Sequence, residues 1–249
     1  NNAQPLPLFN NATQAQKAPG STFKPIIAVA ALEEGVIGLN DTVNCTGIYK
    51  EISPALRCWI YPGQHGPLDV VHGIQNSCNV FFSEMGHRLS MDENGNYSPE
   101  LGIEKIRKYA SLFGLDETSG IEIAEREPQM TTEKPEASSI GQGKNSYSNV
   151  QLSRYITAVA NKGTVFKLSL LDKMTDSQGN LLEDFTPEVR SVIDVKDSTW
   201  NAVHIGMRRV ISDGSARKIF SDLEVDIAGK TGTAEEIKNG HRINHAFFV

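Results

Sequence analysis

The stretch Ala18-Pro19-Gly20-Ser21-Thr22-Phe23-Lys24-Pro25 opens the first apolar segment of the chain, and the seven residues that follow it, 26–32, are all apolar. A hydroxyl residue, an apolar body and the later Gly35 predict a helix with a defined start and end. Because proline lacks a backbone N–H, Pro25 must lie in the first turn, where amides have no intrahelical partner. Ser21 and Lys24 are therefore expected at the positive end of this helix.

Two further motifs follow in a fixed order, Ser77-x-Asn79 and Lys230-Thr231-Gly232. Each motif is weak alone, and a second Ser-x-x-Lys at 215–218 shows how easily that pattern arises by chance. For an isolated copy, the ordinary interpretation is a helix cap followed by a surface lysine. The other two motifs occur only once each, so the ordered set of three favours acyl transfer through serine.

The three motifs supply the groups that such chemistry needs. A serine hydroxyl is a poor nucleophile at neutral pH, and Lys24 lies three residues after Ser21, on the same helix face, where it can accept the hydroxyl proton. That lysine must be neutral, and partial burial together with the second cation Lys230 would lower its pKa. Asn79 is then expected to hold Lys24 and a substrate amide, and Ser77 to pass a proton to the leaving amine.

Residues 224–249 are expected to form a β-hairpin that carries the Lys-Thr-Gly motif, with its turn at Lys238-Asn239-Gly240. Gly229 and Gly232 flank the Lys-Thr pair, so a substrate could lie close to this strand as an added one. Backbone N–H groups of Ser21 and Thr233 would then supply an oxyanion hole.

Composition and charge restrict the remaining classes of protein. Of the 249 residues, 39% are apolar and 22% are charged, which suits one globular domain over residues 1–249. The net charge is −6 and no basic run reaches five residues, so no nucleic-acid partner is expected. The longest apolar run is far below the roughly 20 residues of a membrane span. The chain begins at Asn1 without a signal peptide, so we expect an excised segment, separated from any anchor.

Local patterns divide the domain further. Residues 1–18 are polar and rich in Pro, Asn and Gln, which predicts a lead-in coil, and residues 36–150 are expected to be mostly helical. Trp59 and Tyr61 could line the substrate cleft, or they could pack against the interior of the domain. The other predicted elements are helices at 76–85, 102–113, 149–161 and 197–211, a hairpin at 166–192, and a long surface loop at 128–147 in which Ser139, Gln142 and Asn145 are candidates for the border of the substrate groove.

At these motifs the sequence resembles the transpeptidase domain of the penicillin-binding proteins, in particular the class B branch that serves elongation, division and sporulation. The resemblance runs from about Ala18 to the C-terminus. The Ser-Thr-Phe-Lys-Pro and Lys-Thr-Gly-Thr-Ala runs are far more specific than the bare motifs. The runs that carry the resemblance are 18–25, Ser77-Cys78-Asn79-Val80-Phe81-Phe82, Ile140-Gly141-Gln142-Gly143 and Gly229-Lys230-Thr231-Gly232-Thr233-Ala234.

The resemblance implies an α+β fold of the β-lactamase/transpeptidase type, with an antiparallel β-sheet packed by helices and an all-helical subdomain. Family members build a five-stranded sheet whose first strands precede the Ser-x-x-Lys helix and whose last strand follows the Lys-Thr-Gly hairpin. Few residues precede Ser21 and the sequence stops at Val249, so we expect the domain to be truncated at both ends and the sheet to be incomplete in this segment.

The same resemblance implies a peptidoglycan D,D-transpeptidase that serves cell-wall synthesis and cell shape and is inhibited covalently by β-lactams. Ser21 would attack the penultimate D-Ala carbonyl of a stem peptide ending in D-Ala-D-Ala, and an amine of a neighbouring stem would take the acyl group. Thr231, Gly232 and Thr233 would bind the substrate, with the two threonines gripping its carboxylate. No cofactor would be required for catalysis.

A domain of this kind is expected at the extracytoplasmic face of the bacterial cytoplasmic membrane, anchored by a segment absent from this chain. Membrane proteins of cell-wall synthesis would then be its partners.

The odd number of cysteines leaves three alternatives open. All three could be buried thiols. Cys45 and Cys58 could form a disulfide, since the domain should face the outside. Alternatively, Cys45, Cys58, His65 and Cys78 could bind a structural zinc as four N/S ligands. The resemblance adds weight to zinc, because some class B members carry one near this segment with varied ligands. Cys78 is the least certain ligand, and Asp41 or His72 could replace it.

Two other functions share the three motifs. A serine β-lactamase must hydrolyse its acyl-enzyme, and the class A enzymes use a glutamate that positions water, but no Glu-x-x-Leu-Asn pattern follows Ser77. A β-lactam sensor domain also becomes acylated, so the sequence does not separate it from a transpeptidase.

Overall fold

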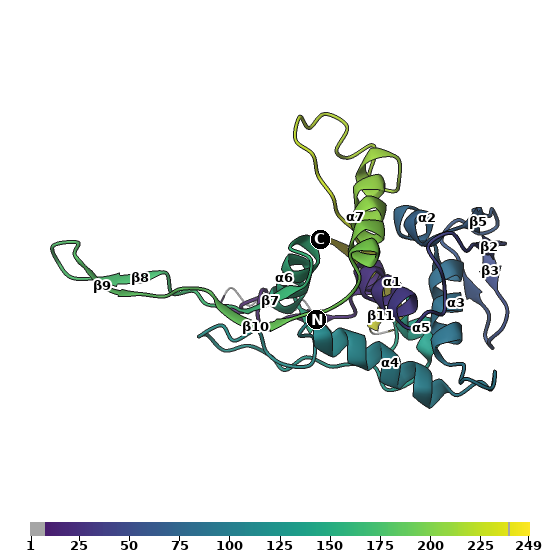
Figure 1. Ribbon diagram of the computed structural model, residues 1–249, viewed down its shortest axis with the longest axis horizontal. Coiled ribbons are helices and arrows are strands. Elements are labelled where there is room, and N and C mark those ends of the chain that lie inside the picture. Colours follow the sequence, from purple (N-terminus) through teal and green to yellow (C-terminus); the bar gives the residue numbers. More distant parts are fainter. Residues whose placement is uncertain (1–7, 239) are drawn as a thin grey trace.

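The computed structural model describes residues 8–238 and 240–249 as helices gathered around one central apolar helix (Figure 1). This helix, α1 (Lys24–Glu33), is buried along all but its last residue. A helix that is apolar on every side must be covered on every side. The helices that contact it are α2 (Val70–Gln75), α3 (Asn79–Leu89), α4 (Pro99–Leu112) and α7 (Asp197–Ser212).

The start of α1 differs from the prediction in one respect. Pro25 lies in the first turn, as expected, but Ser21 is not a hydroxyl cap. Residues Gly20–Phe23 already form a 3₁₀ turn, η1, that runs directly into α1, so the first amides are satisfied by the turn and not by a side chain. Gly20 has a φ of +55°, which glycine adopts readily.

The helix predicted around 76–85 is α3, which begins only at Asn79, and a break separates it from α2. α2 ends at Gln75, α3 begins at Asn79, and Ser77 between them has a φ of +49°. A left-handed serine is uncommon, and no glycine in the sequence marks this position. The break was therefore missed.

Three other helix predictions are confirmed. α4 is capped by Ser98, whose side chain accepts from the Leu101 amide, so this helix begins three residues before the predicted start. α6 (Asn149–Ala160) begins with a capping box between Ser148 and Gln151. α7 covers the predicted 197–211 and one residue more.

The strands of the described residues form six antiparallel pairs and no larger sheet. The incomplete sheet is therefore as expected, and the fold is a mixed one of helices and small antiparallel sheets. The pairs are β1 (Gln16–Lys17) with β6 (Tyr147–Ser148), β2 (Val43–Cys45) with β5 (Gly66–Leu68), β3 (Ile48–Tyr49) with β4 (Leu56–Arg57), β7 (Thr164–Lys167) with β10 (Glu188–Val192), β8 (Lys173–Thr175) with β9 (Leu181–Asp184), and β11 (Thr231–Lys238) with β12 (His241–Phe248).

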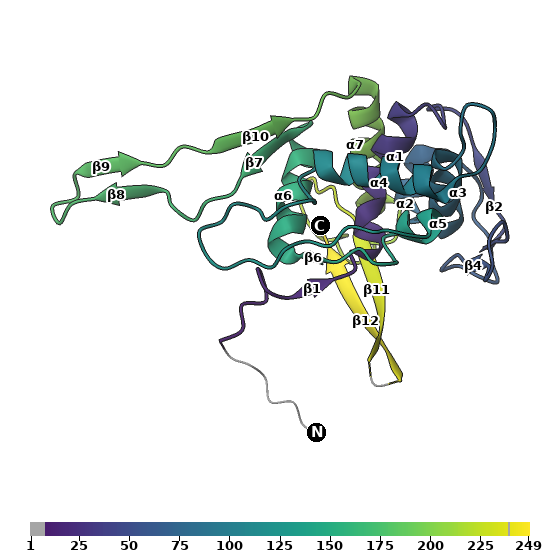
Figure 2. The same ribbon diagram turned by 90° about the horizontal axis from the view of Figure 1, so that it is seen from below.

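Two hairpins leave the body of the molecule (Figure 2). The predicted hairpin at 166–192 is confirmed and forms a long arm, with β8 and β9 at its far end. In the predicted hairpin at 224–249, the strands begin only at Thr231, and β11 and β12 pair along their whole length. The turn was predicted at Lys238-Asn239-Gly240, of which Asn239 lies outside the described residues.

Three predictions of local structure were wrong. Residues 36–150 are not mostly helical and do not form an all-helical subdomain, because their glycines and prolines divide them into short strands and loops between α2, α3, α4 and α5 (Pro135–Ser138). The loop at 128–147 is not a surface loop: Thr131 and Asn145 are buried there, and the Asn145 side chain accepts from the Thr131 amide at 3.0 Å. The lead-in 1–18, described from residue 8, contains β1.

In the part of the chain that the structure describes, we find no helix with both the length and the apolar character needed to cross a bilayer.

Candidate active site

Strand β11 and the turn η1 lie in close contact, and two glycines make this possible. A Cβ atom on Gly20 would lie 2.5 Å from the Thr233 carbonyl oxygen, and one on Gly232 would lie 2.7 Å from Cγ2 of Thr22. Neither position can carry a side chain without a shift of backbone or of a buried residue. The contact places Ser21 beside the Lys-Thr-Gly motif.

A cleft of about 830 Å³ opens where the three motifs meet. Another hollow of about 860 Å³ lies against α4 and α5, but it contains none of the motif residues. The predicted residues that line the cleft are Ser21, Ser77, Asn79, Thr231, Gly232 and Thr233. The others, Leu56, Arg57, Cys58, Trp59, Ile140, Gln142, Ser215 and Glu235, were not assigned to the site from the motifs.

Lys24 forms a buried polar group with Ser77 and Asn79, which we call the lysine cluster. Its Nζ donates to the Ser77 carbonyl and to Oδ1 of Asn79, each at 2.8 Å, and lies 3.3 Å from the Ser77 hydroxyl. Burial lowers the pKa of Lys24 to about 8, and the electrostatic influence of the nearby Cys78 and Cys58 sulfurs acts in the opposite direction. A neutral amine has two N–H donors, which the two short bonds use, so its lone pair is left to accept a proton.

Lys230 is also fully buried, and its Nζ donates to the Thr231 carbonyl at 2.9 Å. Burial, followed by the charge of Lys24, holds the pKa of Lys230 well below its ordinary value. Sequence reasoning named partial burial and the second cation together, without ranking them. In the structure, desolvation is the larger cause for both lysines.

Ser215 is a cleft residue that the sequence did not reveal. Its hydroxyl lies 2.9 Å from that of Thr231. The loop after α7 is fixed next to it, because Ala216 is buried and its amide donates to the Val210 carbonyl at 3.0 Å. Its place in a second Ser-x-x-Lys pattern was attributed to chance, and no other signal marks it.

The three loop candidates have different positions. Gln142 lines the cleft, as proposed. Ser139 is buried and donates to the Pro135 carbonyl at 2.8 Å, and Asn145 is buried under Thr131. These two residues therefore shape the loop from beneath and do not border the groove.

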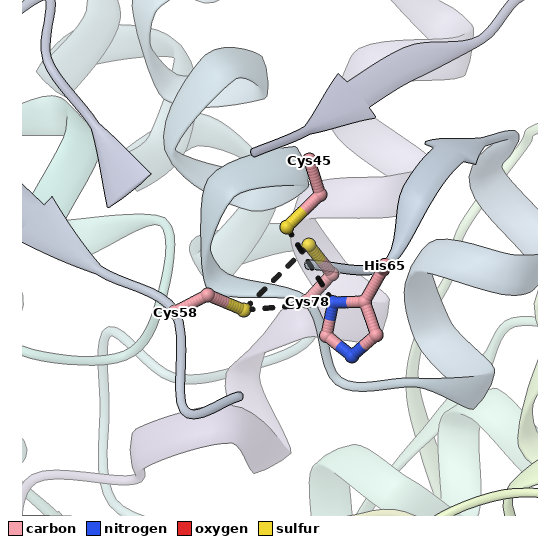
Figure 3. Close-up of side chains that lie close together, drawn as sticks. All are labelled: Cys45, Cys58, His65 and Cys78. Carbon is pink, nitrogen blue, oxygen red and sulfur yellow. Dashed lines mark hydrogen bonds between the residues drawn. The ribbon is translucent and has the colours of Figure 1, made fainter. Parts of the chain in front are cut away.

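The three cysteines converge on His65 in what we call the thiol cluster (Figure 3). All three are free thiols, so the Cys45–Cys58 disulfide is not formed. His65 Nδ1 lies 3.5 Å from the sulfur of Cys45 and 3.6 Å from that of Cys58, and the sulfur atoms of Cys58 and Cys78 are 3.9 Å apart. Two side chains considered as replacement ligands have other partners, Asp41 with the Gly38 amide and His72 with Asp69.

These distances suit a tetrahedral zinc ion. With Zn–S bonds of about 2.3 Å and Zn–N bonds of about 2.1 Å, tetrahedral geometry puts two sulfurs about 3.8 Å apart and a sulfur and a nitrogen about 3.6 Å apart. The hydrogen bond between the Cys58 and Cys78 sulfurs lowers the pKa of Cys58, and thiolate is the form that binds metal. Nδ1 of His65 faces the thiols, whereas its Nε2 is buried without a partner in the described residues.

Comparison with known proteins gives similarities in sequence to a family and to a curated protein. The family model described as "Penicillin binding protein transpeptidase domain" matches residues 1–249. Peptidoglycan D,D-transpeptidase MrdA of Escherichia coli (strain K12) is 30% identical over 263 residues, covering 95% of this chain and 39% of that protein. The chain thus spans about two fifths of the length of this curated relative.

Solved structures agree in fold. A chain from a peptidoglycan synthase complex that coordinates polymerization and crosslinking has a TM-score of 0.82 at 26% identity, covering 95% of this chain and 40% of that one. Pseudomonas aeruginosa PBP2 in complex with WCK 5153 has a TM-score of 0.79 at 26% identity, covering 97% of this chain and 54% of that one.

Proposed function

This chain belongs to the penicillin-binding protein transpeptidase family, and we propose that it cross-links peptidoglycan stem peptides through an acyl-enzyme on Ser21. The observation that carries the proposal is the single cleft lined by Ser21, by Ser77 and Asn79, and by residues 231–233. A nucleophile, a proton-transfer route and hydroxyl groups for a carboxylate thereby border one substrate-sized space.

Acylation begins when Oγ of Ser21 attacks the carbonyl carbon of the penultimate D-Ala and neutral Lys24 accepts the hydroxyl proton. The pKa of about 8 makes a neutral lysine accessible near neutral pH. The backbone N–H groups of Ser21 and Thr233 stabilise the oxyanion. Thr231 and Thr233 bind the terminal carboxylate and so orient the scissile bond.

The acyl-enzyme forms when the C–N bond to the terminal D-Ala breaks. The leaving amine takes the proton that Lys24 received, relayed through the Ser77 hydroxyl 3.3 Å from Nζ. An amine of a neighbouring stem then attacks the Ser21 ester and displaces the serine. The amine loses a proton, Ser21 regains one, and the new amide is the cross-link.

A structural zinc in the thiol cluster is part of this proposal. Cys45, Cys58, His65 and Cys78 would hold it, and it would supply four bonds that tie the loops of residues 45–65 to the start of α3. The sulfur–nitrogen and sulfur–sulfur distances support it. Catalysis itself requires no cofactor, because the acid, base and nucleophile are all side chains.

We place this activity at the extracytoplasmic face of the bacterial cytoplasmic membrane, where stem peptides are cross-linked. Membrane proteins of cell-wall synthesis are the proposed partners. Similarity to a chain of a peptidoglycan synthase complex supports a partner of that kind.

Intact-mass spectrometry after addition of benzylpenicillin tests the proposal. We expect an adduct that maps to Ser21, persists for hours and is absent from Ser21→Ala. Rapid loss of the adduct would identify a β-lactamase instead, and the absence of any adduct would contradict the assigned nucleophile.

Cross-linking of D-Ala-D-Ala stem peptides with an acceptor amine separates a transpeptidase from a sensor. We expect product with the unaltered protein and none with Ser21→Ala. A persistent penicillin adduct without any cross-linked product would assign the sensor function.

A further inference from the structure

The cleft has a second wall, formed by residues 56–59, that none of the three motifs supplies. Arg57 and Trp59 line the cleft with exposed side chains, Trp59 being 59% exposed, whereas Cys58 between them is buried in the thiol cluster. Successive side chains of a strand point to opposite faces, and here Arg57 ends β4 and the chain turns at Trp59, so that both side chains reach the cleft on either side of Cys58. One face of this segment is therefore presented to whatever occupies the cleft.

This wall is fixed to the Ser-x-Asn motif. The side-chain amide of Asn79 donates to the Arg57 carbonyl at 3.2 Å, and the indole N–H of Trp59 donates to the Asn76 carbonyl at 2.8 Å. These two hydrogen bonds hold the segment at both residues that face the cleft, so the positions of Arg57 and Trp59 at the cleft wall are defined before a ligand binds. A ligand group that reaches Asn79 is also next to Arg57.

Arg57 is a cation with no carboxylate partner among the described residues. Its guanidinium lies over the Tyr61 ring, 4.7 Å from the centroid, and this contact fixes one face while leaving its N–H edge for other partners. Among the residues that line the cleft, Arg57 is the one cation and Glu235 the one anion in the described chain. The wall thus offers an unpaired positive charge beside an exposed aromatic ring.

We propose that Arg57 and Trp59 form a subsite for a second carboxylate of the acyl donor, upstream of the scissile bond. The inference rests on the proposed function and deepens it. With the terminal carboxylate at Thr231 and Thr233 and the reacting carbonyl at Ser21, the upstream amide meets Asn79, and the next substituent meets Arg57. The planar guanidinium matches a carboxylate in two hydrogen bonds, and the indole covers the apolar groups next to it. The ligand class is an acyl donor with an anionic group adjacent to its upstream amide.

A matched pair of penicillins tests this subsite. Carbenicillin is benzylpenicillin with one added carboxylate, on the carbon next to the side-chain amide carbonyl. We would measure the second-order rate constant of Ser21 acylation by each compound on the full-length protein. Arg57→Gln is expected to lower the carbenicillin-to-benzylpenicillin rate ratio about tenfold, and Arg57→Lys to lower it less, because the charge remains while the two-pronged geometry is lost.

Lys173→Gln is the matched control, since it removes the same charge from the arm far from the cleft (Figure 1). It should leave the rate ratio unchanged. A ratio that falls equally in both variants would reveal a general charge effect, and an unchanged ratio in Arg57→Gln, or an equal loss for both penicillins, would overturn the subsite. If benzylpenicillin does not acylate Ser21 in the unaltered protein, that result would instead contradict the proposed function itself.

Donor peptides provide an independent readout. Two peptides ending in D-Ala-D-Ala would be compared, with the upstream α-carboxylate free in one and amidated in the other. We expect the unaltered protein to prefer the free acid and Arg57→Gln to lose that preference. No preference in the unaltered protein would contradict the inference.

Discussion

The tripeptide Ser77-Cys78-Asn79 contributes to two buried polar clusters that are built very differently. Ser77 and Asn79 belong to the lysine cluster, where each short hydrogen bond from Lys24 ends on a protein oxygen. Cys78 belongs to the thiol cluster, where three sulfurs and one imidazole nitrogen face one another. The first cluster satisfies its own hydrogen-bonding groups, whereas the second brings together four potential metal ligands and leaves Nε2 of His65 without a partner among the described residues.

Burial therefore has opposite consequences a few ångströms apart. In the lysine cluster it lowers the pKa of an amine to about 8 and so makes the neutral, basic form accessible near neutral pH. In the thiol cluster it groups four atoms that a cation could hold together and leaves Nε2 of His65 without a partner among the described residues, which costs free energy. We therefore expect the rate of Ser21 acylation to depend on the lysine cluster, and the stability of the fold to depend on the thiol cluster.

Lys24→Ala should cause the largest effect on chemistry. Removal of a general base lowers rates by about 10²- to 10⁴-fold, and we expect acylation of Ser21 by benzylpenicillin, followed by intact mass, to fall about thousandfold. Lys24→Gln, which keeps a donor for Ser77 and Asn79 but no base, should lose as much. The exposed Lys108→Ala should acylate normally. If Lys24→Ala is acylated at the normal rate, Lys24 is not the base.

The next largest effect should be the change of the acylation rate with pH. Since the neutral form of Lys24 is the active one and its pKa is lowered to about 8, the rate should rise about tenfold for each pH unit up to pH 8 and level off above it. A fluorescent penicillin in stopped-flow experiments from pH 6 to pH 10 measures this profile. A rate that is flat below pH 8 would indicate that the lysine cluster does not titrate in this range.

Removal of the thiol cluster should affect stability more than chemistry. Protein purified without a polyhistidine tag should contain about one zinc per chain by elemental analysis. Cys58→Ser should lose the zinc, and a loss of about 3 kcal/mol would lower the melting temperature by about 6–12 °C. Acylation at low temperature should fall far less than in Lys24→Ala.

His241→Asn, which alters an exposed histidine outside the thiol cluster, should keep both zinc and melting temperature. Metal-free protein that is fully folded and equally stable would end the case for a zinc site.

The smallest effect is expected from Ser215→Ala. This change removes the hydroxyl 2.9 Å from that of Thr231, and a single hydrogen bond of about 0.5–1 kcal/mol corresponds to an acylation rate about two- to fivefold lower. Ser212→Ala, whose hydroxyl bonds the neighbouring Asp213, serves as the control. An unaltered rate in Ser215→Ala would confine the carboxylate site to Thr231 and Thr233.

Local chemistry made much of the fold predictable. Short segments determine the proline in the first turn of α1, the apolar repeats of α4, α6 and α7, and the two hairpins. These predictions are confirmed, although the strands of the last hairpin begin only at Thr231. The convergence of the three motifs was predicted because their residue types make sense together only as one site. The four ligands of the thiol cluster were named for a similar reason.

The positions that were missed depend on contacts between distant segments. The break at Ser77 requires a left-handed serine, which its own propensity does not favour and whose carbonyl accepts from Lys24 of a distant segment at 2.8 Å. The loop at 128–147 is polar in sequence yet partly buried, because side chains such as Thr131, Ser138 and Asn145 bond one another and the backbone. Arg57 belongs to no motif, and the Ser-x-x-Lys pattern that begins at Ser215 was attributed to chance.

The order of the residues by itself determined which groups were available for chemistry: a serine and a lysine one helical turn apart, a strand that glycines keep open, and four zinc-type ligands. Only the tertiary structure decided what those groups could do. The pKa of a lysine depends on how completely other segments exclude water from it, and the geometry of a metal site depends on loops meeting from different parts of the chain. The pKa of the lysine and the geometry of the metal site both depend on distances in space, and these distances cannot be read from the separation of residues along the chain.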